Sequence, residues 1–409
     1  MISGERALSP DRANLALATL FAGMFALGSA ELLVVGVLNL IAADLGVSIP
    51  AAGTLVTAYA LGLAIGGPIL TALTIRLDRR TVLAGALALF IVGNLVGVLS
   101  ASYDVFLAAR AVTGAVQGLF IAAAFAAGIA VVPPERMGRA MAVVISGVAV
   151  SAALGVPLGT LVGHLLGWRG SFAAVVVLAA IALLATLSLV PSVPGRGGGV
   201  GSQARYAFAP RVLAVLVLNF VVFASVYAAL TYVVPFLQSV TGVSGPLVTV
   251  FLLAYGVATA LGSFGGGRFA DHNAARTLIA GTTGVALSLL ALYLVGTIGP
   301  LVVLALLAWG IFAFGMAASL QYRVVSLAGP GGPLAQSLPA SAINLGIAFG
   351  SFAGGVALNS FSAAATVLTA FILSLVAVAG AGATSGLRPP AIEVSTDHAV
   401  SRRPAAEAA

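Results

Sequence analysis

The stretch PSVPGRGGGVGSQARYAFAPR, residues 191–211, interrupts an otherwise strongly apolar chain of 409 residues close to its midpoint. It is rich in glycine, proline and arginine, a composition typical of turns and irregular connections. A long and mainly apolar segment lies on each side of it. We therefore interpret this stretch as a linker between two halves of the chain.

The composition indicates a membrane protein. Hydrophobic residues make up 61% of the chain and charged residues only 7%, whereas an ordinary soluble domain is about 25% charged. The absence of cysteine and lysine excludes disulfides, thiolate metal sites and a P-loop lysine. The net charge of +7 does not indicate nucleic-acid binding, because the arginines are scattered between apolar segments instead of forming a basic groove.

Apolar stretches of about 20 residues recur along both halves, each long enough to cross a hydrocarbon core of about 30 Å as a helix. In the first half the predicted spans are 15–41, 51–73, 81–100, 105–132, 140–166 and 172–190. In the second half they are 212–237, 246–267, 277–297, 300–326, 334–357 and 362–384. The sequence therefore predicts an all-α membrane protein of about twelve transmembrane helices in two six-helix bundles.

The predicted units are an N-terminal tail (1–14), a first bundle (15–190), the linker, a second bundle (212–386) and a disordered C-terminal tail (387–409). An even number of spans places both termini on one side of the membrane. Most arginines fall in alternate loops and in the tails, and Arg169 alone lies in a loop on the other face. By the positive-inside rule we expect the termini and the linker to be cytoplasmic.

Several motifs resemble those of the major facilitator superfamily. GPILTALTIRLDRRTVL (67–83) resembles its loop signature of glycine, aspartate and paired basic residues, although Ile75 and Asp78 depart from the usual pattern. GGGRFADHNAAR (265–276) repeats part of this signature half a chain later, and RAVTGAVQG resembles the Arg-x-x-x-Gly signature with Arg110 and Gly114. The resemblance implies that the halves are repeats with a substrate site near the membrane midplane. It also implies a gating role for the loop residues Arg76, Asp78, Arg79, Arg80, Gly267, Asp271 and Arg276.

The stretch SGVAVSAALGVPLGTLVGHLLGWRGSF (146–172) resembles a motif associated with exporters, with Val156 where the fuller form has glycine. Its motif residues are Gly147, Gly155, Pro157, Gly159 and Gly163. This motif is similar to that of the twelve-helix drug:proton antiporter branch, which includes chloramphenicol-resistance and sugar-efflux exporters. Glycines four residues apart allow close helix packing, and the proline permits a kink, so the motif serves packing or movement.

Glu31 lies in the apolar run MFALGSAELLVVGVLNL (24–40), and Arg110 lies in the fourth predicted span. A charge at the bilayer centre costs about 2.5–3.5 kcal/mol on insertion scales, so such residues usually face a cavity or a partner. At 1.5 Å per residue both lie about 22–24 Å from the cytoplasmic side, and the resemblance places both helices against the central cavity. One hypothesis is that Glu31 carries protons while Arg110 tunes its ionisation. The alternative is a static buried pair.

Further polar and aromatic residues in or near the spans are candidates for lining the substrate cavity. The alternatives are ordinary interhelical hydrogen bonds and interfacial tyrosines. These candidates are Asn39, Tyr59, Gln117, Asn219, Tyr227, Tyr232, Gln321 and Asn344. The three histidines show no metal-ligand spacing, so neither a metal nor a cofactor is predicted.

These observations predict a monomeric exporter in the inner membrane that exchanges protons for a small amphipathic compound such as chloramphenicol. Efflux of a sugar or nucleoside and proton-symport uptake remain open alternatives. A membrane enzyme or a receptor is a remote one, because the spans show no paired nucleophile and base that would indicate catalysis. The expected partners are the substrate, protons and the lipid bilayer.

Overall fold

The computed structural model describes residues 9–133, 136–194, 205–329, 335 and 338–390. All the regular secondary structure in these ranges is helical. The first-half elements are α1 (Pro10–Leu45), α2 (Ile49–Leu61), the π-helical turn η1 (Gly62–Gly66), α3 (Gly67–Leu73), α4 (Arg79–Leu99), α5 (Tyr103–Ala130), α6 (Met137–Val150), the π-helical turn η3 (Ser151–Gly155) and α7 (Val156–Leu189). The second-half elements are α9 (Pro210–Leu230), α10 (Val233–Ser239), α11 (Pro246–Leu294), α12 (Gly299–Gly315), α13 (Ala317–Ala328), α15 (Leu338–Ser360) and α16 (Ala363–Ser385).

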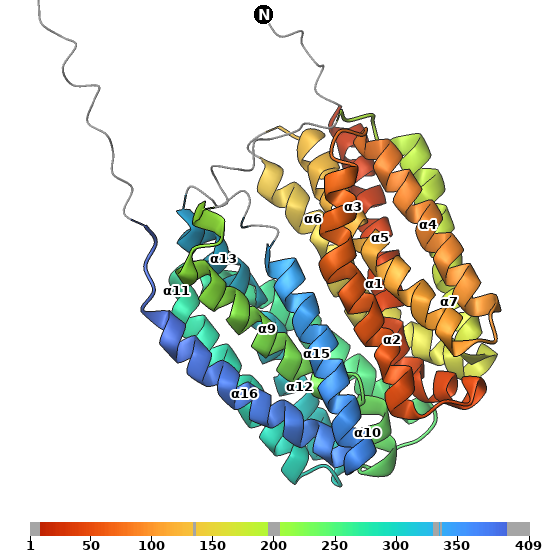
Figure 1. Cartoon of the computed structure of the whole chain (residues 1–409), viewed down its shortest axis with the longest axis vertical. Coiled ribbons are helices and arrows are strands. Elements are labelled where there is room, and N and C mark those ends of the chain that lie inside the picture. Colours follow the sequence, from red (N-terminus) through yellow and green to blue (C-terminus); the bar gives the residue numbers. More distant parts are fainter. Residues whose placement is uncertain (1–8, 134–135, 195–204, 330–334, 336–337, 391–409) are drawn as a thin grey trace, which may run out of the picture.

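Eleven helical stretches of the described residues are long and apolar enough to cross a membrane, and one of them is long enough for two crossings, so these elements account for the twelve that the sequence predicts. Several crossings are built from consecutive elements, for example α2–η1–α3, α9–α10 and α12–α13. Residues 139–189 form one apolar helical stretch, which Gly167 breaks into two crossings with φ 74° and ψ 165°. In α11 the break lies at Asn273, with φ −162° and ψ 89°. The fold is the expected all-α arrangement of two bundles, which stand side by side in Figure 1.

Local sequence signals set several helix ends. Ser48, Asp78, Ser102 and Ser362 precede α2, α4, α5 and α16, and each side chain accepts a hydrogen bond from a first-turn backbone amide. Helix α1 begins at Pro10 and so takes in part of the segment expected as a tail, because proline suits the first helical turn. The remaining tail residues 1–8 and 391–409 and the linker residues 195–204 lie outside the described residues.

The start of α1 and the end of α16 lie toward the same end of the molecule, which we call the termini end (Figure 1). In the second bundle Arg323 of α13 donates hydrogen bonds to the carbonyl oxygens of Thr384 and Leu387 at the end of α16. Arg211, near the start of α9, donates to the carbonyl oxygen of Leu327 over 2.8 Å. Arginine side chains therefore tie three helix ends of this bundle together.

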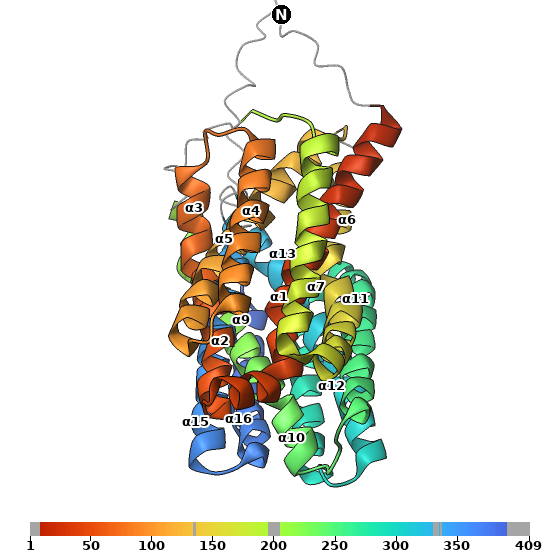
Figure 2. The same cartoon turned by 90° about the vertical axis from the view of Figure 1, so that its right-hand side faces the viewer.

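The two bundles touch near the other end of the molecule, which we call the opposite end. The Asn39 amide of α1 donates to Gln238 Oε1 of α10, which lies beside the connection between α1 and α2 (Figure 2). Thr57 of α2 donates to the Ala348 carbonyl oxygen of α15 over 3.3 Å. These polar contacts join the bundles on the side away from the termini.

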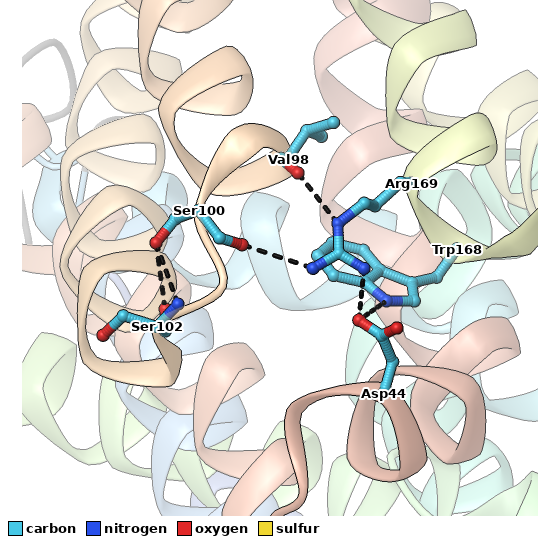
Figure 3. A network of polar contacts seen from close by, with 6 residues as sticks. All are labelled: Asp44, Val98, Ser100, Ser102, Trp168 and Arg169. Carbon is cyan, nitrogen blue, oxygen red and sulfur yellow. Dashed lines mark hydrogen bonds and ion pairs between the residues drawn. The ribbon is translucent and has the colours of Figure 1, made fainter.

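Arg169 connects three parts of the first bundle at the opposite end (Figure 3). It forms an ion pair with Asp44 of α1, and its Nε donates to the Val98 carbonyl oxygen over 3.0 Å. A further hydrogen bond reaches the Ser100 carbonyl oxygen, and the guanidinium lies 4.4 Å from the centre of the Trp168 ring. The arginine that departs from the charge pattern of the loops thus has a local acidic partner.

Glycines hold the helices of the first bundle close together. A Cβ atom on Gly147, Gly155, Gly159 or Gly163 would lie 2.3–2.6 Å from an atom of α1, so the exporter-motif stripe packs against that helix. A Cβ on Gly114 of α5 would lie 2.0 Å from the Tyr59 carbonyl oxygen of α2. Because the nearest atom belongs to the backbone of α2, no side chain can rotate to make room for a methyl group at Gly114.

We predict that Gly114→Ala destabilises the protein, because the new methyl group pushes α2 away from α5. Overpacking of this kind costs about 1–3 kcal/mol. The matched control is Gly85→Ala, since nothing lies within 4 Å of a Cβ at that position of α4. Thermal unfolding of the purified protein in detergent measures both variants, and equal melting temperatures would contradict the assignment.

Candidate functional site

Glu31 lies in the middle of α1, where its carboxylate takes part in a chain of hydrogen bonds. Gln117 Nε2 of α5 donates to Glu31 Oε2 over 2.5 Å. Tyr59 of α2 donates its hydroxyl hydrogen to Gln117 Oε1. Gln117 and Tyr59 are almost fully buried, while Glu31 is half-buried. Three helices of the first bundle thus meet at this carboxylate.

Arg110 is 1% exposed, and several protein groups surround its guanidinium. Its guanidinium donates to the carbonyl oxygens of Ala30, Glu31 and Leu55 at 3.0, 3.4 and 3.5 Å. The same group lies 3.9 Å from the centre of the Tyr59 ring, a distance suited to a cation–π interaction. The arginine therefore joins α1, α2 and α5.

The sequence predicts that Glu31 and Arg110 lie at similar depth, and the structure places them side by side. Within the described part of the chain, however, no ion pair within 4.0 Å joins their side chains. The guanidinium binds the backbone of α1, and the carboxylate takes its hydrogen bond from Gln117. The two groups are therefore neighbours that are held by different partners, and whether the arrangement is static or exchanges protons stays open.

Glu31 borders a small pocket at the interface between the two bundles. Helices α1, α2 and α5 contribute to it from the first bundle, and α9 and α15 from the second. Its lining residues are Glu31, Val56, Tyr59, Ala60, Arg110, Tyr227 and Ile347. Because both bundles supply the walls, any movement of one bundle against the other changes the surroundings of the carboxylate.

Of the candidate cavity residues, Tyr59, Gln117 and Tyr227 gather at this site. Asn39 lies at the contact with Gln238 near the opposite end. Tyr232 is fully buried and donates its hydroxyl hydrogen to the Ser351 carbonyl oxygen over 2.9 Å. The Asn39–Gln238 and Tyr232–Ser351 hydrogen bonds therefore hold helices together away from Glu31.

The remaining candidates lie elsewhere in the second bundle. Asn219 and Asn344 each donate a side-chain hydrogen bond to the carbonyl oxygen four residues earlier in their own helix. Among the described residues neither buried Oδ1 atom has a donor, so both offer an acceptor. Gln321 lies partly buried in α13.

In the first loop with the superfamily-like signature, Asp78 caps α4 by accepting hydrogen bonds from the Thr81 amide and from Ser192 Oγ at 3.2 and 2.6 Å. Partial burial raises the pKa of Asp78, but these hydrogen bonds outweigh it and hold the pKa below its usual value. Arg79 donates to the Ile75 carbonyl oxygen, and its backbone amide donates to Val193. This loop thus binds the segment that follows α7.

The other predicted gating residues differ in their exposure and in their position relative to the helices. Arg76 is exposed and Arg80 is half-buried. Arg276 is exposed in α11, just after the break at Asn273. Gly267 and Asp271 belong to the same helix before the break, but their side chains lie outside the described residues.

Sequence reasoning missed two features. Asp44, the partner of Arg169, is separated from it by 125 positions and was not considered. Tyr255 and Phe314 line a second pocket between the bundles, and they look like ordinary members of apolar spans. No local sequence pattern indicates the Asp44–Arg169 pair or this pocket, because both are formed by residues from helices far apart in the chain.

Two helical bundles with a pocket at their shared interface form the arrangement expected of a membrane transporter. A sequence model of the Major Facilitator Superfamily matches residues 19–333, and the chain belongs to this superfamily. Its members carry small-molecule substrates across lipid bilayers and are transporters, not enzymes. The chain is accordingly a multi-pass membrane protein of this type, as its motifs predict.

Several proteins are similar in sequence to this chain over more than four fifths of its length. The uncharacterized MFS-type transporter YtbD of Bacillus subtilis (strain 168) is 33% identical over 377 residues, which cover 90% of this chain and 94% of that protein. A chloramphenicol resistance protein of Streptomyces lividans is 31% identical over 340 residues, covering 82% and 86% of the two chains. Among solved structures, a bacterial homolog of the human lysosomal transporter Spinster, in an inward-facing and unoccupied conformation, has a TM-score of 0.74 at 15% identity and covers 92% of this chain and 98% of its own.

We predict that Arg110→Met destabilises the protein and that adding Glu31→Gln does not restore it. Each hydrogen bond to a charged group contributes about 1.5–3 kcal/mol, and the carbonyl acceptors of Arg110 remain after the carboxylate is neutralised. Thermal unfolding of the wild type, both single variants and the double variant measures this. Recovery of stability in the double variant would instead assign Arg110 the role of a counter-charge for Glu31.

Proposed function

We propose that this protein is a proton-coupled exporter of a small amphipathic compound, such as an antibiotic of the chloramphenicol kind. The observation that carries the proposal is the Glu31 carboxylate in a pocket shared by both bundles. The named relative from Streptomyces lividans supports the substrate class. The glycine and proline motif before Gly167 supports the export direction.

In this proposal Glu31 alternates between a proton and the substrate. An ionised carboxylate is costly away from water unless it has a partner. When the pocket is closed, Glu31 therefore favours either protonation or a hydrogen-bond donor of the substrate. Tyr227 of the second bundle lines the same pocket, so rocking of the bundles exposes or encloses the carboxylate. Arg110 keeps Glu31 in place through the backbone and adds a nearby positive charge.

We further propose that the termini end faces the cytoplasm of a cell that carries the protein in its inner membrane, and that the protein acts as a monomer. The arginine-rich loops support this orientation. The contacts Asn39–Gln238 and Thr57–Ala348 then hold the pocket shut toward the outside. The loop residues around Asp78, Arg79 and Arg276 serve the gate at the cytoplasmic end.

We predict that Glu31→Gln abolishes proton release when chloramphenicol is added to the purified protein in weakly buffered detergent solution, because the amide cannot lose a proton. In everted vesicles with an acidified lumen, the same variant loses drug-induced alkalinisation. The matched control is Asp104→Asn, an acid exposed in the first turn of α5.

Three outcomes separate the alternatives. Normal proton release by Glu31→Gln contradicts the role of Glu31. Alkalinisation by sugars or nucleosides, with no response to drugs, supports the alternative substrate class. Proton movement in the same direction as the solute contradicts antiport and supports symport.

Single cysteine variants test the proposed orientation, because the chain has no cysteine of its own and each variant therefore carries one thiol. Ser192→Cys lies in the exposed loop after α7 at the termini end, and Ser102→Cys lies in the exposed loop between α4 and α5 at the opposite end. In intact cells a membrane-impermeant maleimide labels Ser102→Cys and spares Ser192→Cys. The reverse pattern would contradict a cytoplasmic termini end.

A further inference from the structure

A small apolar cluster lies at the termini end of the second bundle, where α13 ends and α9 begins (Figure 1). It is separate from the main core and also includes the segment that follows α16. Its buried residues are Ala207, Val212, Val215, Val324, Leu327, Ala328 and Ala335, and Leu387 packs against them. Three segments that are far apart in the chain therefore meet at this end.

Four arginines surround this cluster in the sequence. Each lies one or two positions from a residue of the cluster or from Leu387. They are Arg205, Arg211, Arg323 and Arg388. We call these four residues the arginine site.

Two members of the arginine site use only part of their hydrogen-bonding capacity. Arg211 donates one hydrogen bond, to the Leu327 carbonyl oxygen over 2.8 Å, and Arg323 donates two, to the carbonyl oxygens of Thr384 and Leu387. A guanidinium offers five N–H donors. Arg323 is only 9% exposed, and its buried Nε has no acceptor among the described residues. A buried donor without an acceptor is costly, so this end of the bundle favours a further acceptor.

The charge of the arginine site is not balanced within the described part of the chain. Arg205 and Arg388 are exposed, and neither forms a hydrogen bond or an ion pair with another described residue. The sequence from 205 to 390 contains one acid, Asp271, whose side chain lies outside the described residues. Four positive charges around one small cluster therefore favour an anionic ligand.

Exposed aromatic side chains lie among these arginines. Tyr206 and Phe208, which follow Arg205, are 37% and 51% exposed, and Tyr322, which precedes Arg323, is 56% exposed. Tyrosine is enriched at the headgroup level of membranes, where its ring contacts apolar groups and its hydroxyl contacts water. A free anion such as inorganic phosphate gains nothing from exposed rings. Rings and arginines together therefore favour the headgroup of a lipid over a soluble anion.

We propose that the arginine site binds the headgroup of an anionic phospholipid, such as phosphatidylglycerol, from the leaflet at the termini end. The phosphate oxygens accept hydrogen bonds from Arg205 and Arg388, because a guanidinium matches the geometry of a phosphate. Arg211 and Arg323 add positive charge beside it. The bound lipid thereby holds the start of α9, the end of α13 and the segment after α16 together. This inference does not depend on the direction or the substrate of transport.

The test is the affinity of the purified full-length protein for phosphatidylglycerol, measured by native mass spectrometry over a series of lipid concentrations. We expect Arg205→Gln and Arg388→Gln to weaken binding by about 5-fold each, because each removes one arginine from the attraction for an anionic lipid. Both side chains are exposed, so the variants are expected to fold. The matched control is Arg12→Gln, an exposed arginine in the first turn of α1, which we expect to bind like the wild type.

A second measurement needs only the wild-type protein and covers the case in which a variant folds poorly. Thermal unfolding in detergent is followed with phosphatidylglycerol, with phosphatidylcholine or with inorganic phosphate. We expect phosphatidylglycerol to raise the melting temperature, because a ligand that binds only the folded state stabilises it. Phosphatidylcholine has no net charge, and inorganic phosphate has no apolar part, so we expect neither to raise it as much.

Three outcomes would overturn the proposal. Equal affinity of the wild type for phosphatidylglycerol and phosphatidylcholine would show that no anionic headgroup is recognised. Equal affinity of the wild type, Arg205→Gln and Arg388→Gln for phosphatidylglycerol would place the lipid elsewhere. Inorganic phosphate that stabilises the protein as much as phosphatidylglycerol, or displaces it, would make the ligand a soluble anion instead of a lipid.

Discussion

The first bundle depends on the burial of the Arg110 guanidinium. A positive charge inside the membrane needs solvation by protein, and here three backbone carbonyls and the Tyr59 ring provide it. Two of these carbonyls belong to Ala30 and Glu31. The residue that carries the carboxylate is therefore held through its backbone. The contact between the helices therefore does not depend on the Glu31 side chain.

Close glycine contacts occur both within the first bundle and between the bundles, and polar side-chain contacts add to the latter. Glycines bring backbones together inside the bundle, as at Gly114 and along the stripe that faces α1. Between the bundles, Asn39 and Thr57 reach partners with flexible or short polar side chains. Gly256 of α11 approaches the Ala152 carbonyl oxygen closely and forms a narrow backbone contact. The interface between the bundles thus combines close glycine contacts with a few polar side-chain contacts.

The sequence predicts the spans and the depth of the central charges, but not how their side chains pair. Span length and rise per residue are local properties, which explains the agreement for the crossings and for the similar depth of Glu31 and Arg110. That the two helices lie side by side was implied only by the resemblance to the superfamily. The hydrogen-bond partners depend on how each helix is rotated about its axis. Gln117 was therefore recognised as a cavity candidate but not as the partner of the carboxylate. The Asp44–Arg169 pair and the Tyr255–Trp309 rings depend in the same way on contacts between segments far apart in the chain.

The position of Glu31 also limits the energetics of the proposed exchange. Of the acids whose side chains the structure describes, Asp11, Asp44 and Asp104 lie in terminal turns of their helices and Asp78 caps one, whereas Glu31 lies mid-span. A single carboxylate that holds either one proton or one neutral substrate exchanges one positive charge per cycle. Such a cycle moves net charge across the membrane, so the membrane potential and the pH gradient both drive it. A cationic substrate would replace the proton charge for charge, and its export would then respond to the pH gradient alone.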